Sequence, residues 1–397
     1  MKRYNLNFLF LVCLNISMQA QNLRTSTVIA DKITKLPLEN VNIYNSKDNS
    51  ITNEDGLFVF VSENKEINLS LIGYNDVKTT YDEIKIKDTV FMEIQAINLE
   101  EIIVSDAASI IKRVHENISK NYSLTPYTEN FFLRCLLKKN TELVRLQDIY
   151  CKVFKDKVFN TDLRKETEFA VEILNMRKIG IVDKAEITYF EFPNFNSFLR
   201  LSSSILFNRR DNYNFTEIKS EDNKFRKINF ITKEKNENNQ NINGYFIISK
   251  EDYSLKEFSL DFYDDIGSIP YQEKKGHKFR TTVYRITTNY RKNFDTNKYY
   301  LSNSKLDAKV EILGDNKLEN SIYDFTANLF TTNSFTGENI NSNFSVDKDI
   351  FKAKFPYSAD FWNNQNQLPL TQELNNFLKR VAENKDKKKE FEVIGNF

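Results

Sequence analysis

The chain has 397 residues, of which 56 are lysine or arginine and 55 are aspartate or glutamate, so its formal net charge is +1. This balance argues against a nucleic-acid partner and against binding to an anionic membrane surface, both of which use a basic excess. The 33 phenylalanines and 19 tyrosines favour β-strands, because flat rings pack well on a pleated, half-buried surface.

The first residues have the pattern of a secretory signal peptide. Lys2 and Arg3 precede an apolar stretch, residues 8–14, that is too short to span a bilayer. We therefore expect residues 1–20 to be removed and the mature protein to begin near Gln21, in the periplasm or in association with the outer membrane. No later stretch is apolar enough for a transmembrane helix, so an association with the outer membrane would not use one.

Short alternating strands are predicted for residues 21–104. Apolar and polar residues alternate around Val41 and Ile43, and again in the stretches 67–71 and 90–94. Such alternation is typical of strands that bury one face, and polar turns separate the stretches. We expect a small antiparallel β-sandwich in this part of the chain.

The stretch SITNEDGLFVF, which contains Asp55 and Gly56, has three interpretations. A calcium loop that started at Asp48 would need glycine at its sixth position and glutamate at its twelfth, where this chain has Asn53 and Val59. A pair of catalytic acids is disfavoured, because adjacent residues of a strand point to opposite faces. A type I′ hairpin turn, in which both central residues take positive φ, fits Asp-Gly best. We expect Asp55 and Gly56 to have a structural role.

Four stretches of this segment occur in an order that resembles a known family. They are VIADKITKLPLENVNIYN, SITNEDGLFVF, LSLIGYNDV and INLEEIIVSD. The segment is similar to the carboxypeptidase-regulatory-like domain, a transthyretin-like seven-stranded sandwich. That domain often stands at the N-terminus of TonB-dependent outer-membrane receptors and other exported proteins of Gram-negative bacteria, and it carries no catalytic residues. One departure is Thr27, where the family usually has glycine.

Residues 105–127 are predicted to form a linker that contains a helix. Ile111, Val114 and Ile118 recur at helical spacing, and they form one apolar stripe. His115 lies beside that stripe, where a structural histidine at a domain junction is a better interpretation than a metal ligand.

The strongest strand patterns lie in residues 128–355. Two faces alternate in the stretch YYLSNSKLDAKVEIL, with Tyr300, Leu306, Ala308, Val310 and Ile312 on the first and Asn303, Lys305, Asp307, Lys309 and Glu311 on the second. Similar stretches follow one another through hairpin loops, and this succession predicts a meander that forms a larger curved antiparallel sheet. The order GYFIISKEDYSLKEFSLDFY, YRITTNYRK, KYYLSNSKLDAKVEI resembles the half-barrel of lipoprotein-carrier and sorting proteins.

Two cysteines of this part are predicted to remain separate thiols. The stretches ENFFLRCLL and ELVRLQDIYCKVF flank the turn KKNT and form a predicted hairpin. Folding about Asn140 places Cys135 near Arg145 and Cys151 near Glu129. That separation is roughly 20 Å along the strands, whereas a disulfide needs Cα atoms within about 7 Å.

The richest aromatic run is ITYFEFPNFNSFLRLSSSILF, residues 187–207. It could line an apolar cavity or form a lid, with ordinary core packing as the alternative. Its candidate ligand-binding residues are Phe190, Phe192, Phe195, Phe198 and Phe207. A second candidate, a calcium site at Asp261, Asp264 and Asp265, is less favoured than a solvated loop.

The C-terminal part, residues 356–397, is predicted to contain a helix and a tail. Leu374, Phe377, Leu378 and Val381 form an apolar stripe, and Thr371 is a candidate N-cap. The terminal Phe397 matches the assembly signal of outer-membrane barrels, but the strands lack the lipid-facing apolar bands of a barrel.

These features predict a mainly β, non-catalytic, exported protein that binds an envelope partner protein or an apolar ligand through its β-rich body. The alternative is an outer-membrane receptor or transport accessory component. A hydrolase is disfavoured, since there is no Gly-x-Ser-x-Gly elbow, no P-loop and no Gly-x-Gly-x-x-Gly motif, and we expect no cofactor. A zinc peptidase is disfavoured too, because the chain has only two histidines, His115 and His277, and Ile118 stands where a His-x-x-Glu motif needs glutamate.

Overall fold

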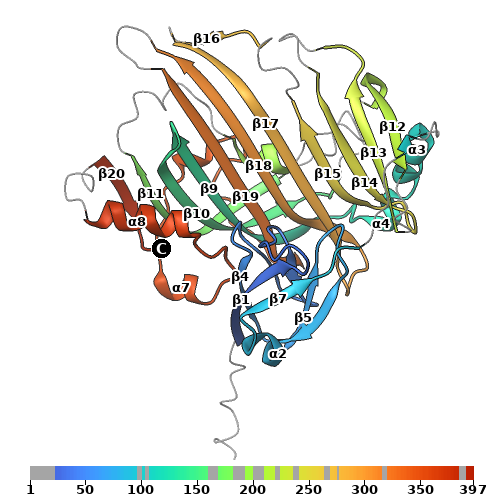
Figure 1. The fold of residues 1–397 in the computed structure, drawn as a ribbon, viewed down its shortest axis with the longest axis horizontal. Helices are drawn as coiled ribbons and strands as arrows, with labels where there is room; N and C mark the ends of the chain where they lie inside the picture. The colour runs from blue at the N-terminus through green and yellow to red at the C-terminus, as the bar shows by residue number, and fades with distance from the viewer. Residues whose placement is uncertain are drawn as a thin grey trace, which may run out of the picture.

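A computed structural model of the chain describes residues 23–95, 101–102, 107–159, 169–181, 193–199, 210–219, 224–235, 241–262, 269–274, 277–314, 320–383 and 390–397. The predicted signal segment, residues 1–20, lies outside this description. The prediction of a mainly β chain is confirmed, with a small N-terminal sandwich, a linker helix, a larger curved sheet and a C-terminal helix (Figure 1). No helix of the described residues is long and apolar enough to cross a membrane.

The N-terminal unit, residues 23–95, contains seven described strands in two sheets, ordered β4-β1-β7 and β3-β2-β5-β6. One expectation was wrong: β1 and β7 run parallel, so the sandwich is not wholly antiparallel. The apolar faces of the two sheets form one core, which includes Ile29, Val41, Phe58 and Leu69. The elements are β1 (Leu23–Asp31), β2 (Asn42–Tyr44), β3 (Asn49–Ile51), β4 (Leu57–Ser62), β5 (Glu66–Ser70), β6 (Val77–Thr80), α2 (Tyr81–Lys85) and β7 (Thr89–Met92).

Asp55 and Gly56 lie in a turn, but the predicted type I′ hairpin is wrong. The strands on either side do not pair with each other, since β3 pairs with β2 and β4 pairs with β1. Gly56 has φ +69°, whereas Asp55 is not among the residues with positive φ. Instead, the Asn53 side chain accepts hydrogen bonds from the backbone N–H groups of Asp55 and Leu57, at 3.0 and 2.9 Å. An asparagine that bonds its own backbone can form such a turn without two positive φ angles.

The rest of the strands form one large sheet of 13 strands. Its order is β20-β11-β10-β9-β19-β18-β17-β15-β14-β13-β12-β8, with β16 paired to β17, and every pair is antiparallel. The predicted meander is therefore confirmed from β12 to β19, and β8, expected within the sandwich segment 21–104, belongs to the large sheet instead. The strands are β8 (Glu101–Ile102), β9 (Tyr127–Lys139), β10 (Glu142–Lys155), β11 (Phe169–Ile181), β12 (Tyr213–Lys219), β13 (Phe225–Thr232), β14 (Asn243–Ser249), β15 (Leu255–Asp261), β16 (Gln272–Lys274), β17 (His277–Lys292), β18 (Tyr299–Leu313), β19 (Ser321–Thr336) and β20 (Phe391–Ile394).

The two faces of the large sheet are covered by different parts of the chain. One face, here called the α3 face, packs against α3, α4, α5 and residues 344–355 around a continuous apolar core. The other, the α8 face, packs against the N-terminal unit, α7 and α8 (Figure 1). The helices are α3 (Ala107–Glu116), α4 (Ile118–Asn121), α5 (Phe195–Leu199), α7 (Ala359–Asn363) and α8 (Gln372–Glu383), and the short 3₁₀ turns are η3 (Arg210–Asn212) and η5 (Ile350–Lys352).

Two predicted strand registers were displaced by bulges. Cys135 lies opposite Gln147 rather than Arg145, and Cys151 opposite Phe131 rather than Glu129, because the turn has two residues and a bulge adds one more. Both cysteines are separate buried thiols, as predicted. In β18 a bulge near Ser302 adds one residue, so side chains before and after it alternate between the two faces of the sheet in opposite order. Tyr300 therefore faces the N-terminal unit, whereas Leu306, which was predicted to share its face, is in the core of the α3 face.

The C-terminal helix agrees with its sequence pattern. Leu374, Phe377 and Val381 are buried against the sheet, and Leu378 packs beside them. The hydroxyl of Thr371 accepts a hydrogen bond from the backbone N–H of Leu374 at 3.3 Å, which is the predicted N-cap. The tail returns to the sheet as its edge strand β20.

A buried ion triad lies on the α8 face, on the three strands next to the edge strand β20. Arg134 of β9, Asp148 of β10 and Arg177 of β11 are direct cross-strand neighbours, so their side chains form one row. Their exposed fractions are 2%, 0% and 6%. Arg134 makes two bonds of 2.8 Å to the carboxylate, and Arg177 adds bonds of 2.9 and 2.7 Å. Burial by itself raises the pKa of Asp148, but the two guanidinium groups outweigh it and hold that pKa below its usual value.

The triad also fixes the path of the chain before α8. Arg134 donates to the carbonyl oxygens of Leu368 and Pro369, at 2.9 and 2.8 Å, and Arg177 donates to the Gln367 side chain at 2.7 Å. These bonds satisfy guanidinium N–H groups that the carboxylate cannot reach. The segment 366–371 is therefore held flat against the sheet, and α8 begins where it ends.

The glycine of the acidic turn gives a matched pair of substitutions. A Cβ at Gly56 would lie 2.4 Å from the Ile29 carbonyl oxygen, whereas a Cβ at Gly73, with φ +88°, would meet nothing within 4 Å. We expect Gly73→Ala to lower the free energy of unfolding by about 1–2 kcal/mol, which is the strain of positive φ alone. Gly56→Ala should lower it by clearly more, as measured by urea unfolding. Equal losses would show that the approach to Ile29 has no energetic effect.

Asp148→Asn should destabilise the fold in a pH-dependent way. At neutral pH the loss should be about 3–5 kcal/mol, because two buried guanidinium groups lose their counter-charge. The pKa of Asp148 is lower in the folded state than in the unfolded state, where it is about 3.9. The ionised carboxylate therefore contributes fully to the free energy of unfolding above about pH 3.9, and this contribution is lost as the pH falls through the folded-state pKa.

Urea unfolding of the wild type and of Asp148→Asn, from pH 7 down to the acid limit of folding, checks this expectation. The difference between the two proteins should narrow below about pH 4. Asp82→Asn, which removes an exposed charge paired with Lys65, serves as the control and should change stability little. A constant difference at all pH values would contradict the assignment.

Candidate functional site

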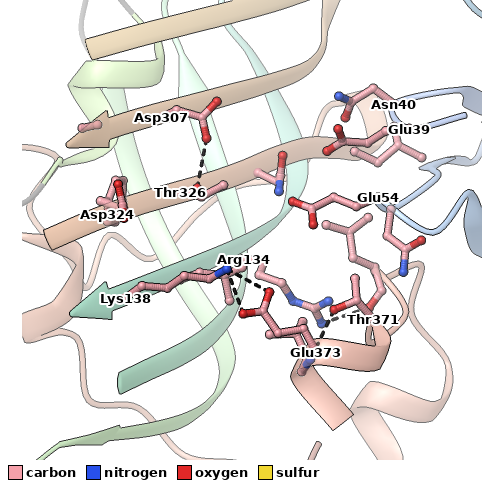
Figure 2. A pocket seen from close by; sticks show the side chains of 18 of the residues that line it. Glu39, Asn40, Glu54, Arg134, Lys138, Asp307, Asp324, Thr326, Thr371 and Glu373 are labelled. Atoms are coloured by element: carbon pink, nitrogen blue, oxygen red, sulfur yellow. Dashed lines mark hydrogen bonds and ion pairs between the residues drawn. The ribbon is translucent and has the colours of Figure 1, made fainter. Parts of the chain in front are cut away.

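The candidate site is a cavity of about 350 Å³ on the α8 face, where three parts of the chain meet. Its walls come from the N-terminal unit at residues 39–40 and 51–54, from strands β9, β18 and β19, and from the start of α8 (Figure 2). Residues that are more than three hundred positions apart therefore share one cavity. Local sequence patterns alone do not reveal such a site.

The acidic turn docks directly on the start of α8. The Asp55 carboxylate accepts a hydrogen bond from the backbone N–H of Gln372, the first residue of α8, at 3.1 Å. The Asn53 side chain donates to the carbonyl oxygen of Pro369 at 3.3 Å. A carboxylate at a helix N-terminus is stabilised by the unpaired N–H groups there. The turn is thus part of the junction, and Glu54 between these two residues is left to line the cavity.

The segment before α8 also binds the edge of the N-terminal unit. The Asn366 side chain accepts from the Val61 N–H at 2.7 Å and donates to the Val61 carbonyl at 3.0 Å, so it pairs with β4 as a neighbouring strand would. On the other side of the cavity, Lys305 of β18 forms an ion pair with Glu39 at 2.8 Å. The cavity wall is therefore held at both ends by polar contacts of fixed geometry.

Most of the charges in the cavity are paired. Lys138 of β9 and Glu373 of α8 lie 2.8 Å apart, and Lys309 and Asp324 lie 3.2 Å apart on neighbouring strands. Asp307 accepts a hydrogen bond from the hydroxyl of Thr326 at 2.9 Å. These pairs line the rim and the sheet wall (Figure 2).

Two acceptors in the cavity have no partner among the residues that the structure describes. The Glu54 carboxylate points into the cavity from the N-terminal unit (Figure 2) and makes no hydrogen bond or ion pair there. Desolvation at the cavity wall raises the pKa of Glu54, and the nearby charge of Glu39 raises it further. Asn328 of β19 is 8% exposed, and its buried Oδ1 has no hydrogen-bond partner. A buried amide oxygen without a donor is destabilising, so a bound group that donates hydrogen bonds would be favoured here.

The described residues contain no group of three histidine, cysteine, aspartate or glutamate side chains placed to hold a metal ion. Of the earlier calcium candidates, Asp261 instead binds the Arg285 guanidinium at 2.6 and 2.9 Å, and Asp264 and Asp265 lie outside the described residues. His115 is exposed on α3.

The aromatic candidates are only partly described. Phe195 and Phe198 lie in α5, with exposed fractions of 0% and 2%, in the core of the α3 face. The Phe195 ring packs edge-on against Phe344, with ring centroids 6.2 Å apart. Phe190, Phe192 and Phe207 lie outside the described residues. The structure therefore places the two described rings far from the cavity on the α8 face and among core residues.

Sequence reasoning did not select the residues that form the cavity. Arg134, Asp148 and Arg177 each interrupt an apolar strand with a charge, and this was a signal that could have been used. A charged residue in the middle of a buried strand is rare unless it is paired. Glu54 lies in the stretch SITNEDGLFVF, for which a pair of catalytic acids was disfavoured, and Asn328 carries no signal in the sequence.

Comparisons with known proteins add little. No protein-family model matches the chain, and no curated protein matches it. Among the solved structures, an outer membrane lipoprotein-sorting protein domain from Vibrio parahaemolyticus is similar, with 12% sequence identity, coverage of 70% of this chain and 100% of that chain, and a TM-score of 0.27. At that TM-score the similarity carries no argument about fold or function. The comparisons thus do not assign the chain to the family that its N-terminal motifs resemble.

Proposed function

We propose that this chain is a non-catalytic binding protein of the cell envelope, and that the cavity between the N-terminal unit, the sheet and α8 holds its ligand. The observation that carries the proposal is the buried Asn328 oxygen, which has no hydrogen-bond partner, together with the exposed Glu54 carboxylate, which has no ion pair among the described residues, in a cavity where most other charges are paired. The buried Asn328 oxygen lowers stability while it has no donor, and a ligand that supplies the donor regains that free energy on binding. The exposed Glu54 carboxylate adds a negative charge at the cavity wall.

The acceptors define the chemistry of the ligand. A carboxylate and an amide oxygen both accept hydrogen bonds, so the complementary group donates them and carries positive charge. A volume of about 350 Å³ is at the lower end of small-molecule sites, and one extended side chain with a terminal ammonium group fits it. We therefore propose a primary ammonium group, either on a small molecule or on a lysine of a partner protein.

The proposal of a binding function without catalysis is supported by the pairing of two acids of the cavity, which leaves Glu54 without a second unpaired glutamate beside it. Glu39 and Glu373 are each engaged by a lysine, so neither is available as an unpaired acid or base. The sequence also lacks the motifs of nucleophilic, phosphate-transferring and dinucleotide-binding enzymes.

The proposal of an envelope location rests on the sequence. Residues 1–20 have the pattern of a signal peptide. Three of the four stretches that resemble a carboxypeptidase-regulatory-like domain fall in a unit that has seven described strands in two sheets, which supports that resemblance, whereas INLEEIIVSD lies beyond this unit and its strand β8 pairs with the large sheet. The hypothesis of an apolar ligand at Phe190, Phe192, Phe195, Phe198 and Phe207 stays a prediction, as does the alternative of an outer-membrane receptor or transport accessory.

Calorimetric titration with two blocked peptides tests the proposed function. Acetyl-Gly-Lys-Gly-amide should bind, and the same peptide with norleucine in place of lysine should not, because the two differ only in the ammonium group. Glu54→Gln should weaken binding of the lysine peptide by at least about tenfold, as expected for a lost charge-assisted hydrogen bond. Asn328→Leu should weaken it too. Glu66→Gln, an exposed acid of β5 outside the cavity, is the matched control and should leave the affinity unchanged.

The pH dependence adds a separate check. Since the pKa of Glu54 is raised, the carboxylate is neutralised at a higher pH than an ordinary glutamate, and affinity should be lost as the pH falls toward that value. Glu54→Gln should remove this dependence. Equal binding of the two peptides, or unchanged affinity in Glu54→Gln, would refute the proposed site.

A further inference from the structure

A second cavity, of about 530 Å³, lies on the α8 face beside the first. It is enclosed by Tyr44 and the loop 70–76 of the N-terminal unit and by strands β14, β15 and β17 of the sheet. Among their lining residues the two cavities share only Glu39 and Asn40, so they lie on either side of that turn. The second cavity differs from the first in its chemistry, because arginine, lysine and aromatic side chains contribute to its walls.

The outstanding feature of this cavity is Arg291, near the end of β17. Its Nη1 is buried and has no hydrogen-bond partner, and no carboxylate of the described residues lies within ion-pair distance of its guanidinium. The contact it does make is with the face of the Tyr44 ring. Burial lowers the pKa of Arg291, yet a guanidinium keeps its proton at all ordinary pH values. A partly desolvated charge without a counter-ion is destabilising, so an anion is the missing partner.

The lining carboxylates do not supply that anion. Glu39 is paired with Lys305 at 2.8 Å, on the side of the first cavity. Glu257 accepts a hydrogen bond from the Tyr245 hydroxyl at 2.7 Å. Asp76 is exposed and forms no ion pair with Arg291. Lys256 and Lys292 also line this wall, but Lys292 lies 3.9 Å from Asp252 and burial lowers the pKa of Lys256 to about 8, so Arg291 carries the charge without a counter-ion.

An aromatic platform lies next to the guanidinium. Tyr44 stacks with Phe294, with ring centroids 6.0 Å apart and an angle of 16° between the planes. Phe294 is 62% exposed, although a large apolar ring in solvent is unfavourable, and it lines the cavity. Amide side chains of Asn40, Asn289 and Gln95 also line the walls, and each amide offers both a donor and an acceptor.

We propose that this cavity binds an acidic sugar, with the anionic group on Arg291, the apolar face of the sugar ring on the exposed ring of Phe294 and the hydroxyl groups on the amides. Hydroxyl groups donate and accept hydrogen bonds, as the amides do, and the C–H face of a sugar ring packs on an aromatic ring. The anion is a carboxylate or a phosphate, since both match a guanidinium fork. This site does not depend on the ammonium site proposed for the first cavity.

The experiment is calorimetric titration of the whole protein, in low-salt buffer, with glucuronate, glucose 6-phosphate and glucose. We expect at least one of the two anionic sugars to bind at least about tenfold more tightly than glucose. Binding of both would assign the shared oxyanion chemistry, and binding of one alone would identify a carboxylate or a phosphate as the anion. No preference over neutral glucose would overturn the proposal.

Two variants and a control separate binding from folding. Arg291→Gln should lower the affinity for the anionic sugar by at least about tenfold while the thermal midpoint of the unliganded protein stays the same or rises, because an uncompensated charge is removed. Phe294→Ala, which changes an exposed ring, should weaken binding without lowering the midpoint. Arg285→Gln removes an exposed arginine from the same strand, outside the cavity, and should leave affinity unchanged. Unchanged affinity in Arg291→Gln, with a lower midpoint, would show that Arg291 only supports the stacking of Tyr44 and would overturn the site.

Discussion

The carboxylate of Asp148, buried between the guanidinium groups of Arg134 and Arg177, is the constraint on which the α8 side of this protein depends. An ion triad inside a protein is tolerated only if every charge and hydrogen-bonding group in it is satisfied. Here three neighbouring strands contribute one member each, and the spare N–H groups are satisfied by the chain between α7 and α8. The position of α8 is thus a consequence of electrostatics in the sheet as well as of its apolar stripe.

The N-terminal unit is attached to this side mainly through polar contacts. The Tyr300 hydroxyl donates to Asn49 at 2.7 Å, and Ser302 donates to Asn42 at 2.7 Å. Asn366 pairs with the backbone of Val61. Hydrogen bonds fix direction and distance more strictly than apolar packing does, so the two surfaces meet at defined points and stay apart between them. The two cavities are the spaces that remain.

Both cavities contain groups that would be more stable with a partner. Among the described residues, the buried Asn328 oxygen and the exposed Glu54 carboxylate have no donor in one cavity, and the buried Nη1 of Arg291 has no acceptor in the other. The first cavity therefore favours a cationic ligand and the second an anionic one. Glu39 and Asn40 are the only lining residues that the two cavities share. Polar groups left without partners in a folded protein are expected at functional sites, where local stability is given up for binding.

The sequence by itself indicated the fold class and part of the secondary structure. Alternation of apolar and polar residues identified strands in the N-terminal unit and in the large sheet, and Leu374, Phe377 and Val381 identified α8 with its cap at Thr371, because these signals need only near neighbours along the chain. Bulges were not predicted, since one extra residue near Ser302 leaves no mark in composition yet turns every following side chain to the other face.

Only the tertiary structure decided where the cavities lie. The pairing of Glu39 with Lys305 and of Asp55 with the first N–H of α8 joins residues 266 and 317 positions apart, and no local pattern encodes such distances. The aromatic run that seemed the best ligand site contributes Phe195 and Phe198 to the core, because apolar rings show the same composition whether they bind a ligand or a neighbouring strand. A site made of unpaired polar groups is recognised only when their surroundings are known. Whether a polar group has a hydrogen-bond or ion-pair partner depends on which distant residues the fold brings near it, and the local sequence does not contain that information.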